Sequence, residues 1–162
     1  MSTIASSYQI EKIKLRQAKQ LKDLFDRALL SDFGYFPADY IDSVRQQNSL
    51  LHLSSATLKQ DRLLLGLWID QLLTGYVIAK LSGLERAYIF WLYVSPEYRG
   101  RGLGNALLES SIDVINKRKI SRVELITHNR KDFYLASGFV VDRQAGNFIG
   151  DVDVYMMSRE LA

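Results

Sequence analysis

The transition from an apolar run at residues 87–94 into a glycine-rich turn and then an apolar helix constrains this fold most. The run AYIFWLYV is almost continuously apolar, which is typical of a strand covered on both faces. Pro96 keeps the residue before it extended, so the chain turns there. Apolar positions at helical spacing then predict a helix over about 102–118. The turn RGRG at 99–102 therefore lies at the N-terminus of a helix.

The glycines and arginines of this turn predict a site for an anion. The first main-chain N–H groups of a helix lack partners within it, and the helix dipole attracts phosphates to them. Gly100, Gly102 and Gly104 let an oxygen approach the backbone without a β-carbon in the way, and Arg99 and Arg101 can add charge-assisted hydrogen bonds. So many donors would serve two phosphates better than one. The alternative is a plain glycine-rich turn with solvated arginines, which the agreement of strand, turn and helix disfavours.

Two other phosphate-binding patterns fit the turn less well. A P-loop needs Gly-Lys-Ser/Thr after its glycines, whereas Asn105 and Ala106 follow here. A dinucleotide fingerprint requires a third glycine at the position of Asn105. It also occurs in an opening βαβ unit, whereas this turn comes late in the chain. An ordinary nucleotide-binding protein is therefore disfavoured.

The remaining pattern predicts one mixed α/β domain over residues 1–162, with helices on both faces of its sheet. A helix from Ala18 to Leu29 and a second one beginning near Pro37 are expected, separated by a loop at 31–37. Residues 48–60 show no clear pattern. The other expected elements are strands at 8–15, 62–69, 72–81, 87–94, 122–127, 139–143 and 151–161, and a short helix at 131–139 that Gly138 would end.

The composition excludes several functional classes. A net charge of +3 without a dense basic run argues against a nucleic-acid partner. The absence of cysteine excludes disulfides, thiol nucleophiles and cysteine-ligated metals, and we expect no metal site. No apolar run approaches the ~20 residues that span a bilayer, and MSTIASSYQIEK lacks the apolar core of a signal peptide. We therefore expect no membrane partner and a cytoplasmic location.

Residues 94–104 resemble the acyl-CoA-binding signature of the GNAT N-acetyltransferase superfamily. That signature has an apolar residue at a strand end, Gln or Arg five positions on, and then Gly-x-Gly or Gly-x-Ala. Val94, Arg99, Gly102 and Gly104 match it here.

A second block of this family commonly reads Phe-Tyr-x-x-x-Gly-Phe, and residues 133–139 match it. The specific match covers residues 87–139, and the order of elements extends the likeness over most of the chain. The resemblance implies a mixed, mostly antiparallel sheet whose strands splay apart at the acyl-CoA site.

The resemblance also implies roles for individual residues, with acetyl-CoA as co-substrate. The Val94 N–H would face the thioester carbonyl as an oxyanion contact, typically worth about 3 kcal/mol. Tyr134 matches the usual general acid, which would protonate the departing thiolate; the alternative is a packed aromatic side chain in a short helix. The residues expected to bind the cofactor are Leu92, Tyr93, Val94, Arg99, Gly100, Arg101, Gly102, Leu103, Gly104 and Asn105.

The chain departs from the family at two positions before Tyr134. Relatives often carry Asn seven residues before this tyrosine and Ala four residues before it. Thr127 and Arg130 occupy these positions, while Asn129 comes two residues late. Side-chain contacts to the cofactor at this turn therefore remain open.

The general base is the larger gap. Many relatives place an acidic residue on the strand that ends at Val94, whereas residues 87–94 contain none. Glu124 and His128 are the nearest titratable residues on the next strand; His128 could relay a proton through water, although a loop histidine without such a task is the simpler interpretation. Deprotonating a lysine-like amine at neutral pH costs roughly 4–5 kcal/mol, against about 1 kcal/mol for an α-amine. The missing base therefore slightly favours an α-amine, or deprotonation before binding.

The acceptor site is expected opposite the cofactor. In this family it is usually lined by the segment between the first two helices and by the last strand pair. Phe33, Tyr35 and Phe36 occupy the first segment, unless they simply fix the second helix to the core. Asp151 and Asp153 are expected on one strand face, where they could attract a cationic amine, although a solvated sheet edge is the simpler interpretation.

The predicted function is direct transfer of an acetyl group from acetyl-CoA to a primary amine of a small molecule, a peptide or a protein, in a ternary complex. The absence of a cysteine to carry an acyl intermediate agrees with direct transfer. The alternative is a non-catalytic acyl-CoA-binding sensor or interaction module with the same fold. A homodimer is compatible with either.

Overall fold

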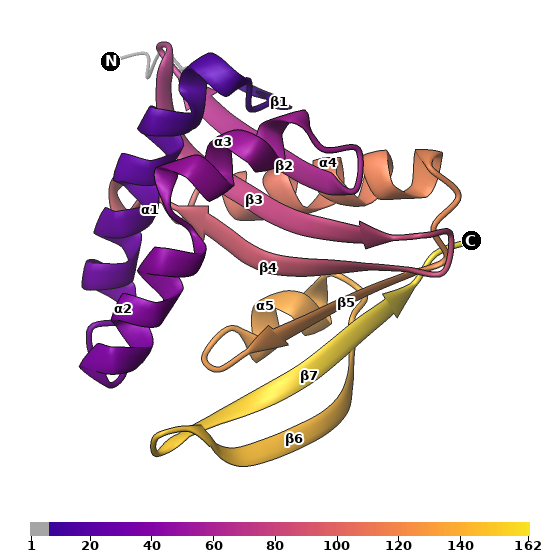
Figure 1. The fold of residues 1–162 in the computed structure, drawn as a ribbon. Helices are drawn as coiled ribbons and strands as arrows, with labels where there is room; N and C mark the ends of the chain where they lie inside the picture. Colours follow the sequence, from indigo (N-terminus) through magenta and orange to yellow (C-terminus); the bar gives the residue numbers. More distant parts are fainter. Residues whose placement is uncertain (1–6) are drawn as a thin grey trace, which may run out of the picture.

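A computed structural model describes residues 7–162; the first six residues of the N-terminal stretch, considered above for a signal peptide, lie outside the described residues. One seven-stranded sheet in the order β1-β2-β3-β4-β5-β7-β6 forms the centre of the molecule (Figure 1). The β4–β5 pair is parallel and the other neighbours are antiparallel. The expected mixed, mostly antiparallel sheet is therefore confirmed.

The elements follow the expected order, with one helix added. Residues 48–60, which carry no clear pattern, contain helix α3, and Ser49 caps it by accepting from the His52 N–H at 3.3 Å. The first strand ends at Lys12 rather than 15, because a 3₁₀ turn follows at Leu15–Gln17. The strands are β1 (Tyr8–Lys12), β2 (Arg62–Ile69), β3 (Leu72–Ser82), β4 (Arg86–Val94), β5 (Arg122–Thr127), β6 (Val140–Ile149) and β7 (Val152–Glu160). The helices are α1 (Ala18–Asp32), α2 (Ala38–Gln47), α3 (Leu50–Leu58), α4 (Leu103–Lys117) and α5 (Lys131–Ala136).

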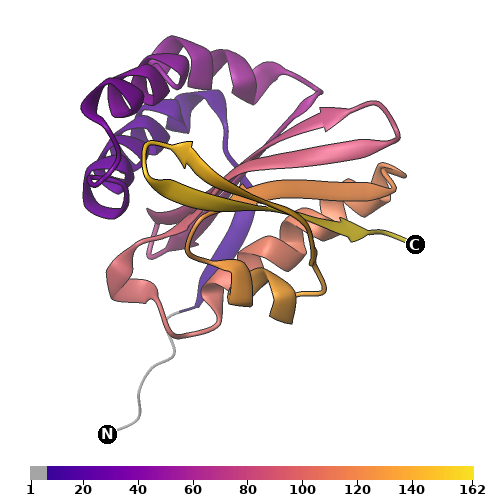
Figure 2. The same cartoon turned by 90° about the horizontal axis from the view of Figure 1, so that it is seen from below.

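Helices cover both faces of the sheet, as the two apolar cores and Figures 1 and 2 show. The apolar stripe of α1 and side chains of α2 and α3 form one core with β2, β3 and β4. The stripe of α4 forms the other core, together with Tyr134 of α5 and Phe139. Within residues 7–162, no helix is both long and apolar enough to cross a membrane.

A β-bulge in β4 changes which face its aromatic side chains occupy. Ile78 of β3 pairs with Trp91 and the next residue, Ala79, pairs with Ile89, so Phe90 is the extra residue. Phe90 and Trp91 consequently both line a cavity beneath α2 and α3, and Phe90 is 48% exposed. The expectation that 87–94 is covered on both faces is therefore wrong for this part of the strand.

The strands β4 and β5 separate toward the ends that carry the site (Figure 1). Their pairing runs only from Arg86–Arg122 to Ile89–Leu125, whereas β4 continues to Val94. On its other side β5 stays paired with β7 as far as Thr127. The gap between β4 and β5 therefore begins after Ile89, which is the splay that the sequence resemblance implies.

Candidate active site

The glycine-rich turn presents a row of free main-chain N–H groups. Gly100 and Gly102 have φ angles of +76° and +75°, a left-handed conformation that side chains other than glycine adopt at a cost. In the described part of the chain, none of the N–H groups from Gly100 to Asn105 has a hydrogen-bond acceptor. The Arg99 N–H donates to the Pro96 carbonyl at 3.2 Å, so the row begins one residue later than the prediction that included Arg99.

These N–H groups border a cavity of about 460 Å³ between the splayed strands, which we call the turn cavity. Phe133 and Tyr134 close it on the side of α5, and Arg130 brings a positive charge to its wall. Arg101 does not line it, because its guanidinium lies over the Tyr98 ring at 5.7 Å. The predicted cofactor residues that line the turn cavity are Leu92, Tyr93, Val94, Arg99, Gly100, Gly102, Leu103, Gly104 and Asn105.

The backbone of Val94 is oriented by strand pairing. The Ser95 N–H donates to the Thr74 carbonyl at 2.8 Å, so these two residues form a hydrogen-bonded pair of the β3–β4 ladder. Hydrogen-bonded and non-hydrogen-bonded pairs alternate, so in the preceding pair, Val94–Gly75, the polar groups of Val94 point away from β3. The Val94 N–H therefore faces the gap between β4 and β5.

The side chain of Arg99 is bound within the protein. Its Nε donates to the Val94 carbonyl at 2.8 Å, and its Nη2 contacts Asp32 Oδ2 at 2.6 Å. The guanidinium also lies 5.4 Å from the Tyr93 ring centre. The expectation that Arg99 and Arg101 add charge-assisted hydrogen bonds to a phosphate therefore stays a prediction, in which Arg99 would contact the phosphate with donors that these two contacts leave unused. Arg130, which the sequence showed only as a departure from the family, is a second cation at the cavity wall.

Tyr134 is held at the turn cavity by the local structure of α5. Gly138, at φ +85°, ends the helix as expected, and the Phe139 N–H donates back to the Tyr134 carbonyl at 3.0 Å. The ring packs edge-on against those of Phe133 and Phe139. Burial raises the pKa of the Tyr134 hydroxyl to about 12, with Arg130 opposing the shift. The phenol is therefore protonated at neutral pH.

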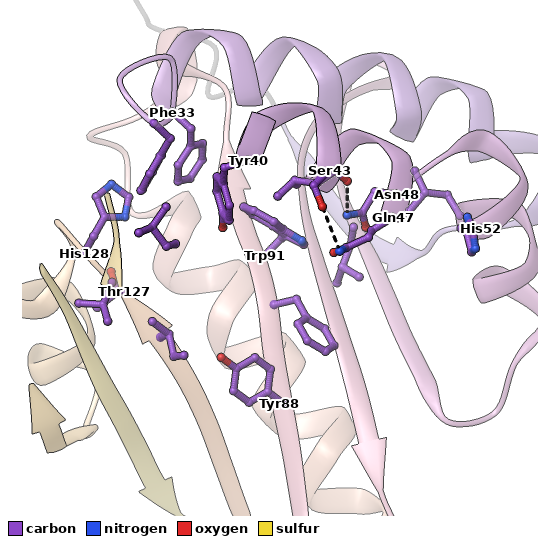
Figure 3. A pocket seen from close by; sticks show the side chains of 18 of the residues that line it. Phe33, Tyr40, Ser43, Gln47, Asn48, His52, Tyr88, Trp91, Thr127 and His128 are labelled. Carbon is purple, nitrogen blue, oxygen red and sulfur yellow. Dashed lines mark hydrogen bonds between the residues drawn. The ribbon is translucent and has the colours of Figure 1, made fainter. Parts of the chain in front are cut away.

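A second cavity of about 460 Å³, the aromatic cavity, lies beneath α2 and α3 on the other core face (Figure 3). Tyr40, Ser43 and Gln47 reach it from one face of α2 because they are spaced by about one and two helical turns. The bulge brings Phe90 and Trp91 to it from β4. The sequence pattern did not predict that β4 contributes Phe90 and Trp91 to this cavity, because a bulge resets the alternation of a strand.

The two cavities meet at three side chains. Phe33, Trp91 and His128 line both of them, and the rings of Phe33 and Trp91 meet edge-on at 5.7 Å. His128 lies 5.3 Å from the Phe36 ring and forms a hydrogen bond through Nε2 with the Tyr35 hydroxyl. Burial, and secondarily the charge of Arg130, lower the pKa of His128. The predicted acceptor residues thus surround a histidine to which the sequence assigned no firm role.

The acidic residues considered from the sequence lie elsewhere. Asp151 is in the turn between β6 and β7, so the expectation that it shares a strand face with Asp153 is wrong. Asp153 accepts a hydrogen bond from the Asn147 N–H at 3.1 Å and stabilises the same hairpin. Glu124 is paired with Arg122 at 3.0 Å. Phe148, Ile149 and Val154 are the residues of this hairpin that line the aromatic cavity.

Solved structures with this architecture define its class. The PaiA N-acetyltransferase from Thermoplasma acidophilum, solved in complex with coenzyme A, aligns with a TM-score of 0.80 and 24% identity over 96% of this chain and 99% of its own. The ribosomal-protein-S18-alanine N-acetyltransferase from Escherichia coli aligns with a TM-score of 0.76 and 21% identity, over 96% and 95% of the two chains. The fold is therefore that of the N-acetyltransferases.

The sequence comparison gives the family. The model of the acetyltransferase (GNAT) family matches residues 19–139, and this chain belongs to that family of acetyltransferases. A spermidine N(1)-acetyltransferase from Thermoplasma acidophilum is 28% identical over 123 residues, which are 70% of this chain and 76% of that protein. A chloroplastic GCN5-related N-acetyltransferase 2 from Arabidopsis thaliana is 34% identical over 74 residues, 45% of this chain and 29% of that protein.

The turn cavity fits the coenzyme of this family. The free N–H groups at residues 100–105 suit a diphosphate, the charge of Arg130 suits a phosphate, and the Val94 N–H faces the space that a thioester would enter.

Proposed function

We propose that this chain, acting as one domain, transfers the acetyl group of acetyl-CoA directly to a primary amine in a ternary complex. One observation carries the proposal: the turn cavity, with its free N–H groups, meets a second cavity at Phe33, Trp91 and His128. The coenzyme would occupy the first cavity and the amine the second. Both reactants would then come together at the junction without an acyl-enzyme intermediate.

The backbone of the turn holds the diphosphate in this proposal. The N–H groups from Gly100 to Asn105 have no acceptor within the described residues and lie at the start of α4, where the helix dipole adds to their attraction for anions. The N–H of Val94 donates to the thioester oxygen as negative charge develops on it. Removing such a donor typically costs about 3 kcal/mol of transition-state stabilisation.

Tyr134 stabilises the leaving thiolate. Because burial raises its pKa to about 12, the phenol is protonated and able to donate at neutral pH. Full proton transfer to a thiolate of reference pKa near 8.5 would cost roughly 5 kcal/mol. Burial also raises the pKa of the thiol, which reduces the difference between the pKa values of the phenol and the thiol. Tyr134 therefore acts first as a hydrogen-bond donor to the sulfur and completes the transfer as the carbon–sulfur bond breaks.

His128 receives the proton that the amine loses. Its pKa is lowered, so the imidazole is neutral at pH 7 and can accept a proton. Its place at the junction allows contact with an amine directly or through one water. The new bond joins the amine nitrogen to the acetyl carbon, the carbon–sulfur bond breaks, and the two protons move to His128 and to the sulfur.

Amine-dependent release of the coenzyme thiol tests this function. Acetyl-CoA would be incubated with the protein and a panel of amines that includes polyamines, because one relative is named for spermidine. We expect thiol release that depends on an amine and yields an acetylated product detectable by mass spectrometry. Coenzyme binding without transfer to any amine of the panel would contradict the proposal and favour an acyl-CoA-binding sensor.

A further inference from the structure

The charged groups around the aromatic cavity are all of one sign. Among the described residues, Lys59 and Arg62 are the side chains with a full charge that line it, and no carboxylate does. The remaining walls are mainly aromatic and aliphatic. Figure 3 shows the polar side chains of α2 and α3 at the end away from His128.

Among the described residues, no carboxylate lines the aromatic cavity because the acidic side chains of the neighbouring elements point elsewhere. The face of α2 that presents Tyr40, Ser43 and Gln47 to the cavity turns Asp39 and Asp42 away from it. Glu124 of β5 lies near this region, since its charge adds to burial in raising the pKa of Tyr88 to about 12.

Glu124 does not present a free carboxylate to the cavity. Its two oxygens are paired with Arg122 at 3.0 Å and with Arg86 at 3.7 Å. A cationic group at the end of the aromatic cavity near Lys59 and Arg62 would therefore face two positive charges without gaining a carboxylate partner, which is unfavourable.

The end of the aromatic cavity that carries Lys59 and Arg62 is separated from the junction with the turn cavity, which lies at Trp91 and His128. Arg62 of β2 pairs with Lys80 of β3, and Lys80 pairs with Tyr88 of β4, so Arg62 lies at the level of Tyr88. Tyr88 and Trp91 pair with Lys80 and Ile78, which are two residues apart, so across the bulge they are separated by about 7 Å along the strand. Lys59, just after α3, lines the same end.

The two cations differ in their partners. Arg62 contacts Asp61 at 2.9 Å. Lys59 has no carboxylate within 4.0 Å in the part of the chain that the structure describes, and it is exposed. Lys59 is therefore the group best placed to bind a carboxylate or phosphate at this end.

We propose that the amine acceptor carries an anionic group at the end opposite its amine, joined to it by an apolar or aromatic body. This inference rests on the proposed function, because it assigns the amine to the junction at His128. The amine lies beside Phe33 and Trp91, the body fills the aromatic cavity, and the anion reaches Lys59 and Arg62. Linear polyamines, which place a second cation at that end, are poor acceptors.

Matched linear amines test the charge preference. Transfer would be measured with 8-aminooctanoate, octylamine, 1,8-diaminooctane and spermidine at one pH and ionic strength. We expect kcat/KM to fall in the order aminocarboxylate, alkylamine, diamine, with roughly tenfold between the first and the last, the size typical of a charge-assisted hydrogen bond. Equal or better use of the diamine or spermidine would overturn the inference.

A charge-reversal variant tests whether Lys59 causes the preference for an anionic group. Lys59→Glu should remove the preference for 8-aminooctanoate or invert it toward 1,8-diaminooctane, each kcat/KM being expressed relative to that for octylamine. Lys117→Glu, at the end of α4 and away from both cavities, is the matched control and should keep the wild-type order. An unchanged preference in Lys59→Glu would count against the assigned anion site.

Binding without turnover separates this inference from the proposed function. If no amine is acetylated, the proposed function fails, and the cavity is then tested by titrating octanoate and octylammonium into the coenzyme-loaded protein by calorimetry. Tighter binding of octanoate, weakened at least severalfold in Lys59→Glu, supports an anion site. Equal binding of the two, or tighter binding of octylammonium, overturns it.

Discussion

Arg99 and Asp32 form an ion pair of 2.6 Å between the first arginine of the glycine-rich turn and the last residue of α1. The two residues are 67 positions apart in the chain. Because the Nε of Arg99 also donates to the Val94 carbonyl, one guanidinium joins α1, the end of β4 and the turn. Arg99 therefore positions the site from within the protein, whether or not it also contacts a phosphate.

Loss of this ion pair should weaken coenzyme binding. Arg99→Ala frees the end of β4, and we expect a dissociation constant for CoA that rises at least tenfold, with a smaller rise for Asp32→Asn. In a double-mutant cycle followed by urea denaturation, the two changes should couple by about 1 kcal/mol. Arg101→Ala is the control, since this side chain lies outside the turn cavity. Strictly additive effects of the Arg99 and Asp32 changes would contradict the assigned contact.

The backbone conformation of the turn gives a second prediction. Gly102→Val places a β-branched side chain at φ +75°, so we expect it to distort the row of N–H groups and to reduce CoA affinity at least a hundredfold.

Gly104→Ala is the matched control for that change. A β-carbon at Gly104 would lie 3.7 Å from the nearest atoms of Phe133, an ordinary contact, and alanine is the better helix former by about 1 kcal/mol. This variant should be at least as stable as the wild type and still bind CoA. Calorimetric titration gives both affinities, and wild-type affinity in Gly102→Val would argue against a backbone anion site.

Removal of the Tyr134 hydroxyl should slow transfer without loss of binding. We expect Tyr134→Phe to reduce kcat by one to three decades while the dissociation constant of CoA changes less than threefold, because the ring packing is retained. Tyr155→Phe, on β7 outside both cavities, should have near wild-type kcat. Equal rates for Tyr134→Phe and the wild type would remove this residue from the reaction.

The lowered pKa of His128 predicts the pH dependence of the reaction. The neutral imidazole is the active form, so kcat/KM calculated for the unprotonated amine should rise with pH and level off, with a midpoint below the ordinary value of 6.5 that His128→Gln abolishes. Arg130, which faces the histidine, adds to this lowering, whereas the Tyr35 hydroxyl is its hydrogen-bond partner. A pH profile of kcat/KM that is the same in His128→Gln would exclude the histidine as proton acceptor.

The lowered pKa of His128 also predicts how the free energy of unfolding changes with pH. Because its pKa is lower in the folded than in the unfolded chain, the unfolded chain binds more protons near and below pH 6.5. The folded state therefore loses stability as the pH falls below 6.5, and His128→Gln should lose less over the same interval. Urea unfolding at pH 7.5 and 5.5 measures the difference; an equal loss in both proteins would contradict the assigned burial.

The sequence predicted the parts of the fold that depend on local patterns. Each of these patterns determines the conformation of only a few neighbouring residues. They are the apolar stripe of α4, the proline that follows Ser95, and the glycines at 102 and 138. The predicted turn residues other than Arg101 line the turn cavity for the same reason.

The sequence could not predict the features that depend on distant contacts. The pairing of Arg99 with Asp32 joins residues that only the folded chain brings together. The bulge at Phe90 shifts a strand register and so creates the aromatic cavity, while the alternation of the sequence pointed to burial on both faces. Helix α3 was missed because its sequence, LLHLSSATL, has no clear apolar stripe.

A crystal structure of the protein with acetyl-CoA and an unreactive acceptor, such as octanoate, tests the central claim most directly. We predict diphosphate oxygens within hydrogen-bonding distance of the N–H groups at residues 100–105 and the thioester oxygen at the Val94 N–H. The acceptor should lie on the far side of Phe33, Trp91 and His128. A coenzyme bound elsewhere, or a turn whose N–H groups are covered by side chains, would contradict the two-cavity arrangement.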